Sequence, residues 1–295
     1  MKIKLFILFL VLSSGALAQG SNSGLKFLTT TESRTASLGE TSIINSYGVS
    51  SALGNPSGLC LTESSEVQIG VMKSIQDINS QYLLLKLKSS DKLSFGFHLL
   101  NYKISDIEIR EIPGESQGTF SSQYLSTGLS AAYKATGQFT LGATAKFLYE
   151  KIFVEDASGF AFDIGGNYKV NDKFILAASV TNLGTMSKLN EVSTELPISA
   201  GVGVAYGFDI SVLTNTAFLE VKNNFQDKKI HFSMALESNY NNLLFARFGY
   251  ITGYDSRNVT AGLGIKYWDF DLSYSFIPYS YNLGDHHSVS LKFII

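Results

Sequence analysis

Residues 92–99 read Lys92-Leu93-Ser94-Phe95-Gly96-Phe97-His98-Leu99, and this pattern decides the fold. A large apolar residue stands at every second position, with Ser, Gly and His between. Because successive side chains of a strand point to opposite faces, a period of two predicts a strand with one apolar face and one small or polar face. The alternation recurs about 14 times between Val67 and Ile295, so the sequence predicts an all-β chain.

The chemistry of the two faces indicates where such a sheet can lie. Another stretch places Phe139, Leu141, Ala143, Ala145 and Phe147 on one face and Thr140, Gly142, Thr144 and Lys146 on the other. Charged residues are only 16% of the chain, below the roughly 25% of ordinary soluble domains. A soluble β-sandwich or propeller, the alternative, needs a charged outer face. Lipid accepts an apolar face if the sheet closes and leaves no edge. We therefore expect a transmembrane, antiparallel, up-and-down β-barrel.

The connections between the predicted strands alternate in length. Short turns such as Ser89–Lys92 and Asn171–Lys173 alternate with longer loops such as 104–120. Outer-membrane barrels show this asymmetry, with their short turns in the periplasm. We expect about 14 strands, with about 12 as the alternative, because the strand around Ala217 and the junction Tyr267-Trp268 are weakly marked.

Tyrosines gather near the ends of the predicted strands. They are Tyr102, Tyr133, Tyr149, Tyr168, Tyr206, Tyr240 and Tyr267, the last beside Trp268. Amphipathic rings favour the membrane–water interface, so these residues are expected to form interfacial belts. The alternative is that aromatic residues are simply good strand formers.

The first 66 residues differ from the rest of the chain. Lys2 and Lys4 precede the apolar run Leu5–Leu12, and Ala16-Leu17-Ala18 offers a small-residue cleavage pattern. We expect residues 1–18 to be a cleaved signal peptide, because the apolar run falls well short of the roughly 20 residues of a membrane-spanning helix. Residues 19–66 are expected to form a plug, with one or two short helical turns, inside a barrel formed by residues 67–295. The predicted location is the outer membrane of a diderm bacterium, with outer-membrane lipid as a partner.

Three segments near the N-terminus carry a family resemblance. They are Gly24-Leu25-Lys26-Phe27-Leu28, Ser33-Arg34-Thr35-Ala36-Ser37-Leu38-Gly39 and Leu53-Gly54-Asn55-Pro56-Ser57-Gly58-Leu59. Together they resemble the opening of the PorV/PorQ family of outer-membrane barrels, which are distantly similar to the FadL transporters. Ser33 and Ser57 stand where those proteins have Ala. The resemblance implies a hatch before the first strand and a role at the type IX secretion system, where such barrels receive cargo for surface attachment.

The resemblance and the barrel pattern single out candidate residues in the plug and in the lumen. The plug candidates are Arg34, Gly39, Asn55, Pro56 and Gly58, and the lumen candidates are Lys146, Asp163 and Arg247. Because a charge in a semi-enclosed lumen needs a partner or water, Arg34 is expected to pair with a lumen carboxylate such as Asp163 and so hold the plug. Residues 55–58 are either a plain turn from plug to barrel or a hinge beside a ligand or export path.

Other kinds of site find little support in the sequence. The formal net charge of −2 gives no basic patch for nucleic acid. No Gly-x-Ser-x-Gly motif marks a nucleophile and no phosphate-binding glycine loop is present, so we expect neither catalysis nor a cofactor. His286-His287 beside Asp285 is expected to lie in a solvated loop, because a metal site needs further ligands and no second cluster is visible.

Two functions remain. The first is a non-enzymatic, plugged outer-membrane barrel that binds secretion-system or cargo proteins and takes part in secretion or surface display, as the PorV/PorQ resemblance implies. The second is a FadL-like conduit for small hydrophobic molecules, in which the plug gates a route through the wall. A continuous apolar pocket between plug and wall would favour the conduit.

Overall fold

The computed structural model describes residues 32–110, 112–193, 195–226 and 228–295. The predicted signal peptide, residues 1–18, lies outside the described residues, as do residues 19–31 with the first of the three resembling segments. No helix in the described ranges is long and apolar enough to cross a membrane.

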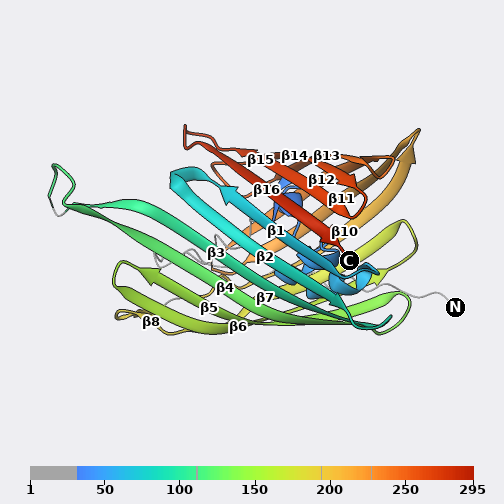
Figure 1. The fold of residues 1–295 in the computed structure, drawn as a ribbon, viewed down its shortest axis with the longest axis horizontal. Helices are drawn as coiled ribbons and strands as arrows, with labels where there is room; N and C mark the ends of the chain where they lie inside the picture. Colours follow the sequence, from blue (N-terminus) through green and yellow to red (C-terminus); the bar gives the residue numbers. More distant parts are fainter. Residues whose placement is uncertain (1–31, 111, 194, 227) are drawn as a thin grey trace.

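Fourteen antiparallel strands form a closed barrel (Figure 1), and β16 pairs with β1 to complete it. The strands are β1 (Glu66–Lys73), β2 (Ile78–Lys88), β3 (Leu93–Ile109), β4 (Gly118–Lys134), β5 (Phe139–Ile152), β6 (Glu155–Lys169), β7 (Phe174–Met186), β10 (Ser199–Ile210), β11 (Leu213–Asn224), β12 (Lys229–Tyr240), β13 (Leu244–Ile251), β14 (Val259–Tyr267), β15 (Phe270–Pro278) and β16 (Asp285–Ile294). The predicted fold class is confirmed, and the alternative of about 12 strands is wrong. The weakly marked segment around Ala217 is β11, and Trp268 lies in the turn between β14 and β15.

The wall alternates as the sequence predicts. Large apolar side chains point away from the lumen, and Leu129, Phe160 and Leu263 are 69%, 65% and 63% exposed. Small polar side chains between them are buried, and Thr144 and Thr260 are 1% and 0% exposed. The face rich in Ser, Thr and Gly therefore lines the interior, and the apolar face forms the outer surface of the barrel.

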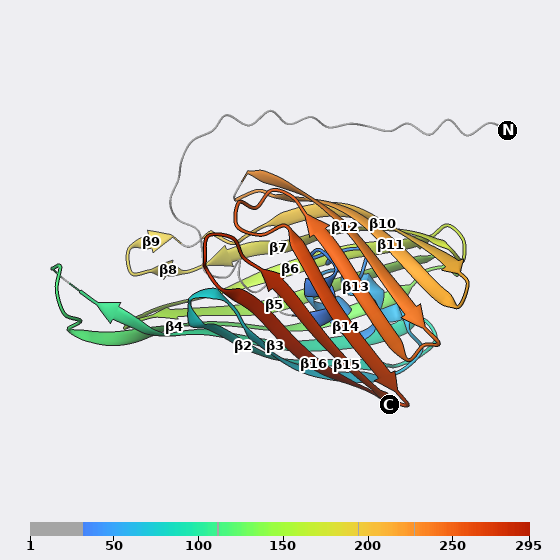
Figure 2. The same cartoon turned by 90° about the horizontal axis from the view of Figure 1, so that it is seen from above.

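The two ends of the barrel differ. At the end called here the turn end, short turns join β2 to β3, β4 to β5 and β6 to β7, and Glu66 pairs with Ile294. At the opposite end, called the loop end, β3 and β4 extend beyond the rest of the barrel (Figure 2). The connection from β7 to β10 holds a small hairpin of β8 (Lys188–Leu189) and β9 (Val192–Ser193), which the sequence pattern did not predict.

Most of the tyrosines predicted to form aromatic belts point outward from the barrel, and one points inward. Tyr133, Tyr168 and Tyr267 are 49%, 43% and 62% exposed near the turn end. Tyr102 is 1% exposed and points into the lumen, because it occupies the inward position of β3. A tyrosine at a strand end therefore joins a belt only if its position in the alternation points outward.

Residues 32–62 pack inside the barrel as a chain of short helical turns. These are α1 (Ser33–Ser37), η2 (Gly48–Leu53) and η3 (Pro56–Leu61), and α1 contacts β14 and β15 whereas η3 contacts β4, β5 and β6. Glu32 caps α1 by accepting hydrogen bonds from the backbone N–H groups of residues 34 and 35. Glycines in the wall make room, since a Cβ at Gly142 or Gly249 would overlap the backbone of this segment.

Candidate functional site in the barrel interior

Arg34 joins α1 to the wall through a carboxylate on β12. Its Nη2 and Nε lie 2.9 Å from Oε1 and Oε2 of Glu237, and its Nη1 donates to the Asn45 carbonyl at 2.9 Å. Arg247 Nε donates to the same Glu237 Oε2 at 2.6 Å, so the carboxylate is shared by two guanidinium groups. Burial alone would lower the pKa of Arg34, but the charges and hydrogen bonds of Glu237 and Tyr47 together outweigh it and raise the pKa above its usual value.

Arg34 pairs with a lumen carboxylate, as expected, but the partner is Glu237 and not Asp163. Asp163 lies on β6, which β7, β10 and β11 separate from β12. Glu237 is the carboxylate that faces α1, and the sequence alone does not specify which strands α1 will meet. Arg247, the predicted lumen residue on β13, is 4% exposed, and its Nη1 donates to Ser273 Oγ at 3.0 Å.

Gly39 ends the α1 segment in a conformation that suits glycine. Its φ of +63° is left-handed, and its N–H donates to Thr260 Oγ1 at 2.8 Å. A Cβ there would come within 3.2 Å of the Tyr250 carbonyl oxygen. The following residue, Glu40, is 2% exposed and forms an ion pair with Arg257 at 2.8 Å.

The Asn55-Pro56-Ser57-Gly58 segment is a docking point between the plug and β6. Asn55 Nδ2 donates to the Ile43 carbonyl at 3.1 Å, and Asn55 Oδ1 accepts from Ser57 Oγ at 2.6 Å. Asn167 of β6 donates to Ser57 Oγ at 2.6 Å. Pro56 begins η3, and a Cβ on Gly58 would overlap the Ser46 carbonyl. The segment is thus buried and forms hydrogen bonds both within the plug and to β6.

Two wall carboxylates that the sequence analysis did not single out also hold the plug. Glu220 of β11 accepts from the N–H groups of Ile43 at 2.8 Å and of Ser42 and Ile44 at 3.2 Å. Glu66 of β1 accepts from the Val49 N–H at 2.9 Å. The alternation along β11 places Glu220 on the lumen face, so the sequence pattern alone could have identified Glu220 as a lumen residue. The wall therefore supplies acceptors for backbone donors that would otherwise be buried without partners.

Lys146 and Asp163, the other lumen candidates, form an ion pair beside an irregularity of the wall. Lys146 Nζ lies 2.7 Å from Asp163 Oδ1. The register of β6 and β7 shifts between Phe162 and Ile164, and Asn182, with a φ of +62°, donates its N–H to Asp163 Oδ1 at 2.7 Å. A cavity of about 50 Å³ adjoins this β-bulge, and its mixed lining includes Lys146, Asn182 and Lys222 beside Leu148, Pro197 and plug residues Leu53 and Gly54.

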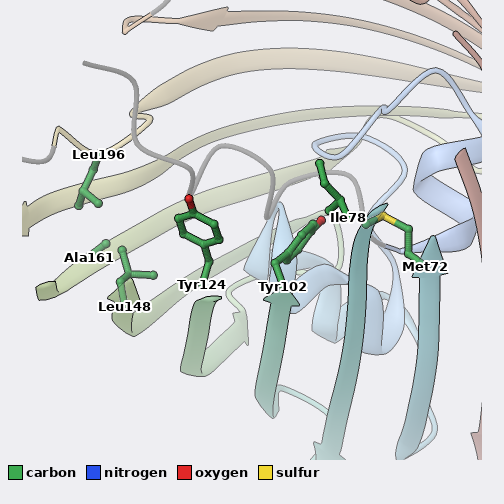
Figure 3. Close-up of a cluster of buried hydrophobic side chains, with 7 residues drawn as sticks. All are labelled: Met72, Ile78, Tyr102, Tyr124, Leu148, Ala161 and Leu196. Atoms are coloured by element: carbon green, nitrogen blue, oxygen red, sulfur yellow. The ribbon is translucent and has the colours of Figure 1, made fainter. Parts of the chain in front are cut away.

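An apolar cluster lines the interior toward the loop end (Figure 3). Its members are Met72, Ile78, Tyr102, Tyr124, Leu148, Ala161 and Leu196. They come from β1 to β6 and from the β7–β10 connection, and Leu148 also borders the cavity at the bulge. The sequence pattern did not predict this cluster, because small residues dominate the lumen face elsewhere in the barrel. The signal was present as large apolar residues at lumen positions near the loop ends of several strands.

The interior near the turn end is charged instead. A cavity of about 200 Å³ there is lined by Arg34, Glu66, Glu237, Arg247, Asp271 and Lys292, among others. Lys292 Nζ lies 3.1 Å from Asp271 Oδ2. The lumen therefore holds an apolar cluster on β1–β6 toward the loop end and an ion-paired cavity near the turn end.

The histidines form no metal site in the part of the chain that the structure describes. His286 and His287 lie in β16 and not in a solvated loop, so that expectation is wrong. β16 begins at Asp285 to pair with Pro278 of β15, and the alternation then buries His286 at 2% exposure. His98 and His231 are likewise buried on lumen positions.

Comparisons with known proteins place this geometry among related folds. Residues 92–248 match the family of unknown function DUF5723. No curated protein sequence matches the chain. The fold is similar to the Ralstonia pickettii toluene transporter TbuX, with a TM-score of 0.64 and 13% identity, covering 90% of this chain and 98% of that chain. It is also similar to the P. putida toluene transporter TodX, with a TM-score of 0.63 and 14% identity, covering 91% of this chain and 99% of that chain.

A Pseudomonas aeruginosa FadL homologue has a TM-score of 0.56 and 11% identity, covering 95% of this chain and 99% of that chain. At these identities the similarity is one of fold, and the fold is that of FadL-like barrels. The comparisons do not show membership of the PorV/PorQ family.

Proposed function

The chain belongs to DUF5723, a family of unknown function, and we propose that it is a non-enzymatic outer-membrane β-barrel that transports small hydrophobic molecules. Residues 1–18 would direct export and be cleaved, residues 19–66 would form the plug, and residues 67–295 would form the transmembrane barrel. The location follows from the apolar outer surface, because an exposed apolar face on a closed sheet suits hydrocarbon.

The observation that carries the proposal is the apolar cluster in the lumen. A soluble or ionic cargo gains nothing from Tyr124, Leu148 and Leu196, whereas a hydrocarbon gains roughly 25 cal/mol for each Å² of apolar surface removed from water. Solved barrels of the same fold include transporters for toluene. The cluster therefore favours the conduit over the secretion role.

The division of the lumen indicates the direction of the route. A hydrophobic molecule that enters at the loop end meets the ion pairs of Arg34, Glu237 and Arg247 before the turn end. Passing them would separate charges from their partners, which is costly. The cavity beside the β6–β7 bulge offers another continuation, since Leu148 joins it to the apolar cluster and plug residues form one of its sides. We infer a route through the wall that the plug gates.

Filling the cluster tests the proposal. Ala161 is 0% exposed within the cluster, so Ala161→Trp should reduce uptake of radiolabelled toluene by cells that express the chain. Ala143→Trp is the matched control, because Ala143 lies on the outer face of the neighbouring strand. Both variants should first show the heat-dependent gel mobility of a folded barrel. If cells that express the unmodified chain took up toluene no faster than cells without the chain, the proposal would be wrong.

A secretion or surface-display role is the second candidate, and the plug motifs are the observation in its favour. Arg34, Gly39, Asn55 and Gly58 of those motifs all contact the wall or the neighbouring plug backbone. Such contacts suit any plugged barrel, so they do not specify a cargo protein. Secreted proteins trapped in the periplasm of a deletion strain would favour this role over transport.

A further inference from the structure

Glu40 of the plug is held by a surface loop of the barrel. Glu40 follows α1 with a φ of +58°. Its Oε1 lies 2.8 Å from Arg257 Nε, and Arg257 Nη2 donates to its Oε2 at 3.1 Å. Arg257 belongs to residues 252–258, the loop that joins β13 to β14 at the loop end. Among the ion pairs of the described residues, this one alone joins the plug to a loop at that end.

Two aromatic rings and a second loop position the Arg257 guanidinium. It lies 3.9 Å from the centroid of Tyr254 and 5.5 Å from that of Tyr279, and Nη1 donates to Tyr279 Oη at 3.1 Å. Ser280 N–H donates to the Ser256 carbonyl at 2.7 Å, which ties the β15–β16 loop to the β13–β14 loop. Cation–π contacts of this kind favour a guanidinium over an ammonium group. The two loops thus hold the Arg257 guanidinium in place together.

The other plug contacts described above are made with strands. Arg34 pairs with Glu237 of β12, the 42–44 backbone binds Glu220 of β11, and Gly39 binds Thr260 of β14. Strands in a closed barrel are held on both sides, whereas loops open more easily. The Glu40–Arg257 pair is therefore the plug contact best placed to respond to an event at the loop end.

The two partners of the pair differ in exposure. The Arg257 side chain is 16% exposed and the Glu40 side chain is 3% exposed. If the loop lifts away, Arg257 can reach water, whereas Glu40 stays buried unless the plug moves. A buried carboxylate that loses its partner is strongly unfavourable. Movement of the loop would thus destabilise the packed position of plug residues 38–41, because Glu40 would lose its partner.

The pair is also connected to the apolar cluster through Tyr279 and Ser74. The Tyr279 hydroxyl hydrogen-bonds to the Ser74 side chain, and Ser74 N–H donates to the Ile78 carbonyl at 2.9 Å. Ile78 is a member of the cluster. A molecule that displaces Ile78 would therefore disturb the loop that holds Arg257.

We propose that Glu40 and Arg257 form an outer latch, through which displacement of the 252–258 loop unbinds the plug at residues 38–46. The latch closes the plug when the loop end is empty and releases it when the loop moves. Its coupling to a hydrophobic molecule rests on the proposed transport function, but the latch itself does not.

Hydrogen exchange of the full chain in detergent micelles tests the latch without any substrate. Arg257→Gln and Glu40→Gln should each speed exchange of the amides in residues 38–46 by about tenfold. The double variant should exchange no faster than the single variants, because both remove the same interaction. Glu63→Gln is the control, since the exposed Glu63–Lys88 pair lies at the turn end.

A second variant covers the case in which Gln is not tolerated. Arg257→Lys keeps the charge but loses the two-point contact with Glu40, so it should speed exchange of the same amides by a smaller factor. Unchanged exchange of residues 38–46 in the folded Arg257→Gln protein would overturn the latch. Faster exchange spread evenly over the barrel strands would also overturn it, because a latch acts locally. A protein that showed the expected exchange but no toluene uptake would contradict the proposed transport function and not the latch.

Discussion

Lys146 Nζ lies 2.7 Å from Asp163 Oδ1 at the point where β6 and β7 change register. The side chains are 8% and 1% exposed, so both charges depend on each other and on Asn182 for compensation. Lys146 of this pair lines the small cavity that Leu148 shares with the apolar cluster. A buried ion pair thus stabilises the bulge beside the route inferred for hydrophobic molecules.

Removal of one partner of this pair should destabilise the barrel. Asp163→Asn leaves the Lys146 ammonium buried without a carboxylate, at a cost of about 3 kcal/mol in the free energy of unfolding. Urea unfolding from lipid vesicles measures this change. The double replacement Lys146→Met with Asp163→Leu should recover much of the loss, because no buried charge then remains. A single variant as stable as the wild type would contradict the role assigned to the pair.

The close approach of Gly249 to Gly39 makes a second prediction. Gly249→Ala places a Cβ against the Gly39 backbone nitrogen. This nitrogen cannot move unless the plug moves, so the free energy of unfolding should fall by about 1–3 kcal/mol. Gly207→Ala is the matched control in another strand, because the Cβ would lie 3.8 Å from the Lys173 carbonyl oxygen, an ordinary contact. Equal thermal unfolding midpoints for the two variants would show that the plug does not rest on Gly249.

Loss of the Arg34 guanidinium should loosen the plug. Arg34→Ala removes both bonds to Glu237 and the bond to the Asn45 carbonyl, whereas Arg34→Lys retains a charge beside Glu237. In planar lipid bilayers, Arg34→Ala should conduct ions more than the wild type does, with Arg34→Lys between them. Identical conductance in all three proteins would mean that Arg34 does not hold the plug closed.

The single tryptophan offers a test of the membrane location without any substitution. Trp268 is 79% exposed, lies at the turn end and stacks on Tyr267 with ring centroids 5.4 Å apart. In an interfacial belt, its fluorescence should shift to the blue on transfer to lipid vesicles. Lipids labelled near the headgroup should quench it more than lipids labelled deep in the acyl chain. Emission typical of water and unaffected by either label would place this end of the barrel outside the membrane.

The sequence predicted the wall better than it predicted the lumen, for a physical reason. Outward positions such as Leu129 and Leu263 need only be apolar, and a period of two reveals them without knowledge of any neighbour. Arg34, in contrast, needs one partner among several inward carboxylates, and barrel closure decides that Glu237 and not Asp163 lies beside it. Contacts between distant segments do not appear in a local pattern.

Tyr102 and His286 illustrate the same limit from another side. Residue type and local context predict a belt position for Tyr102 and a solvated loop for His286. The alternation within β3 and the extent of β16 place both side chains inside the barrel. The apolar cluster could have been found by reading the lumen positions toward the loop end of each strand, where Met72, Tyr124 and Leu148 depart from the small-residue pattern.

The most direct test of the account is to locate a bound hydrophobic molecule within the folded protein. An aryl diazirine of toluene size, photolysed with the protein in lipid vesicles, labels whatever it contacts, and mass spectrometry identifies the residues. The account predicts labels on Tyr124, Leu148 and Leu196 that excess toluene removes, above the background on outer residues such as Leu129. Labels confined to the outer surface, with none in the lumen, would contradict it.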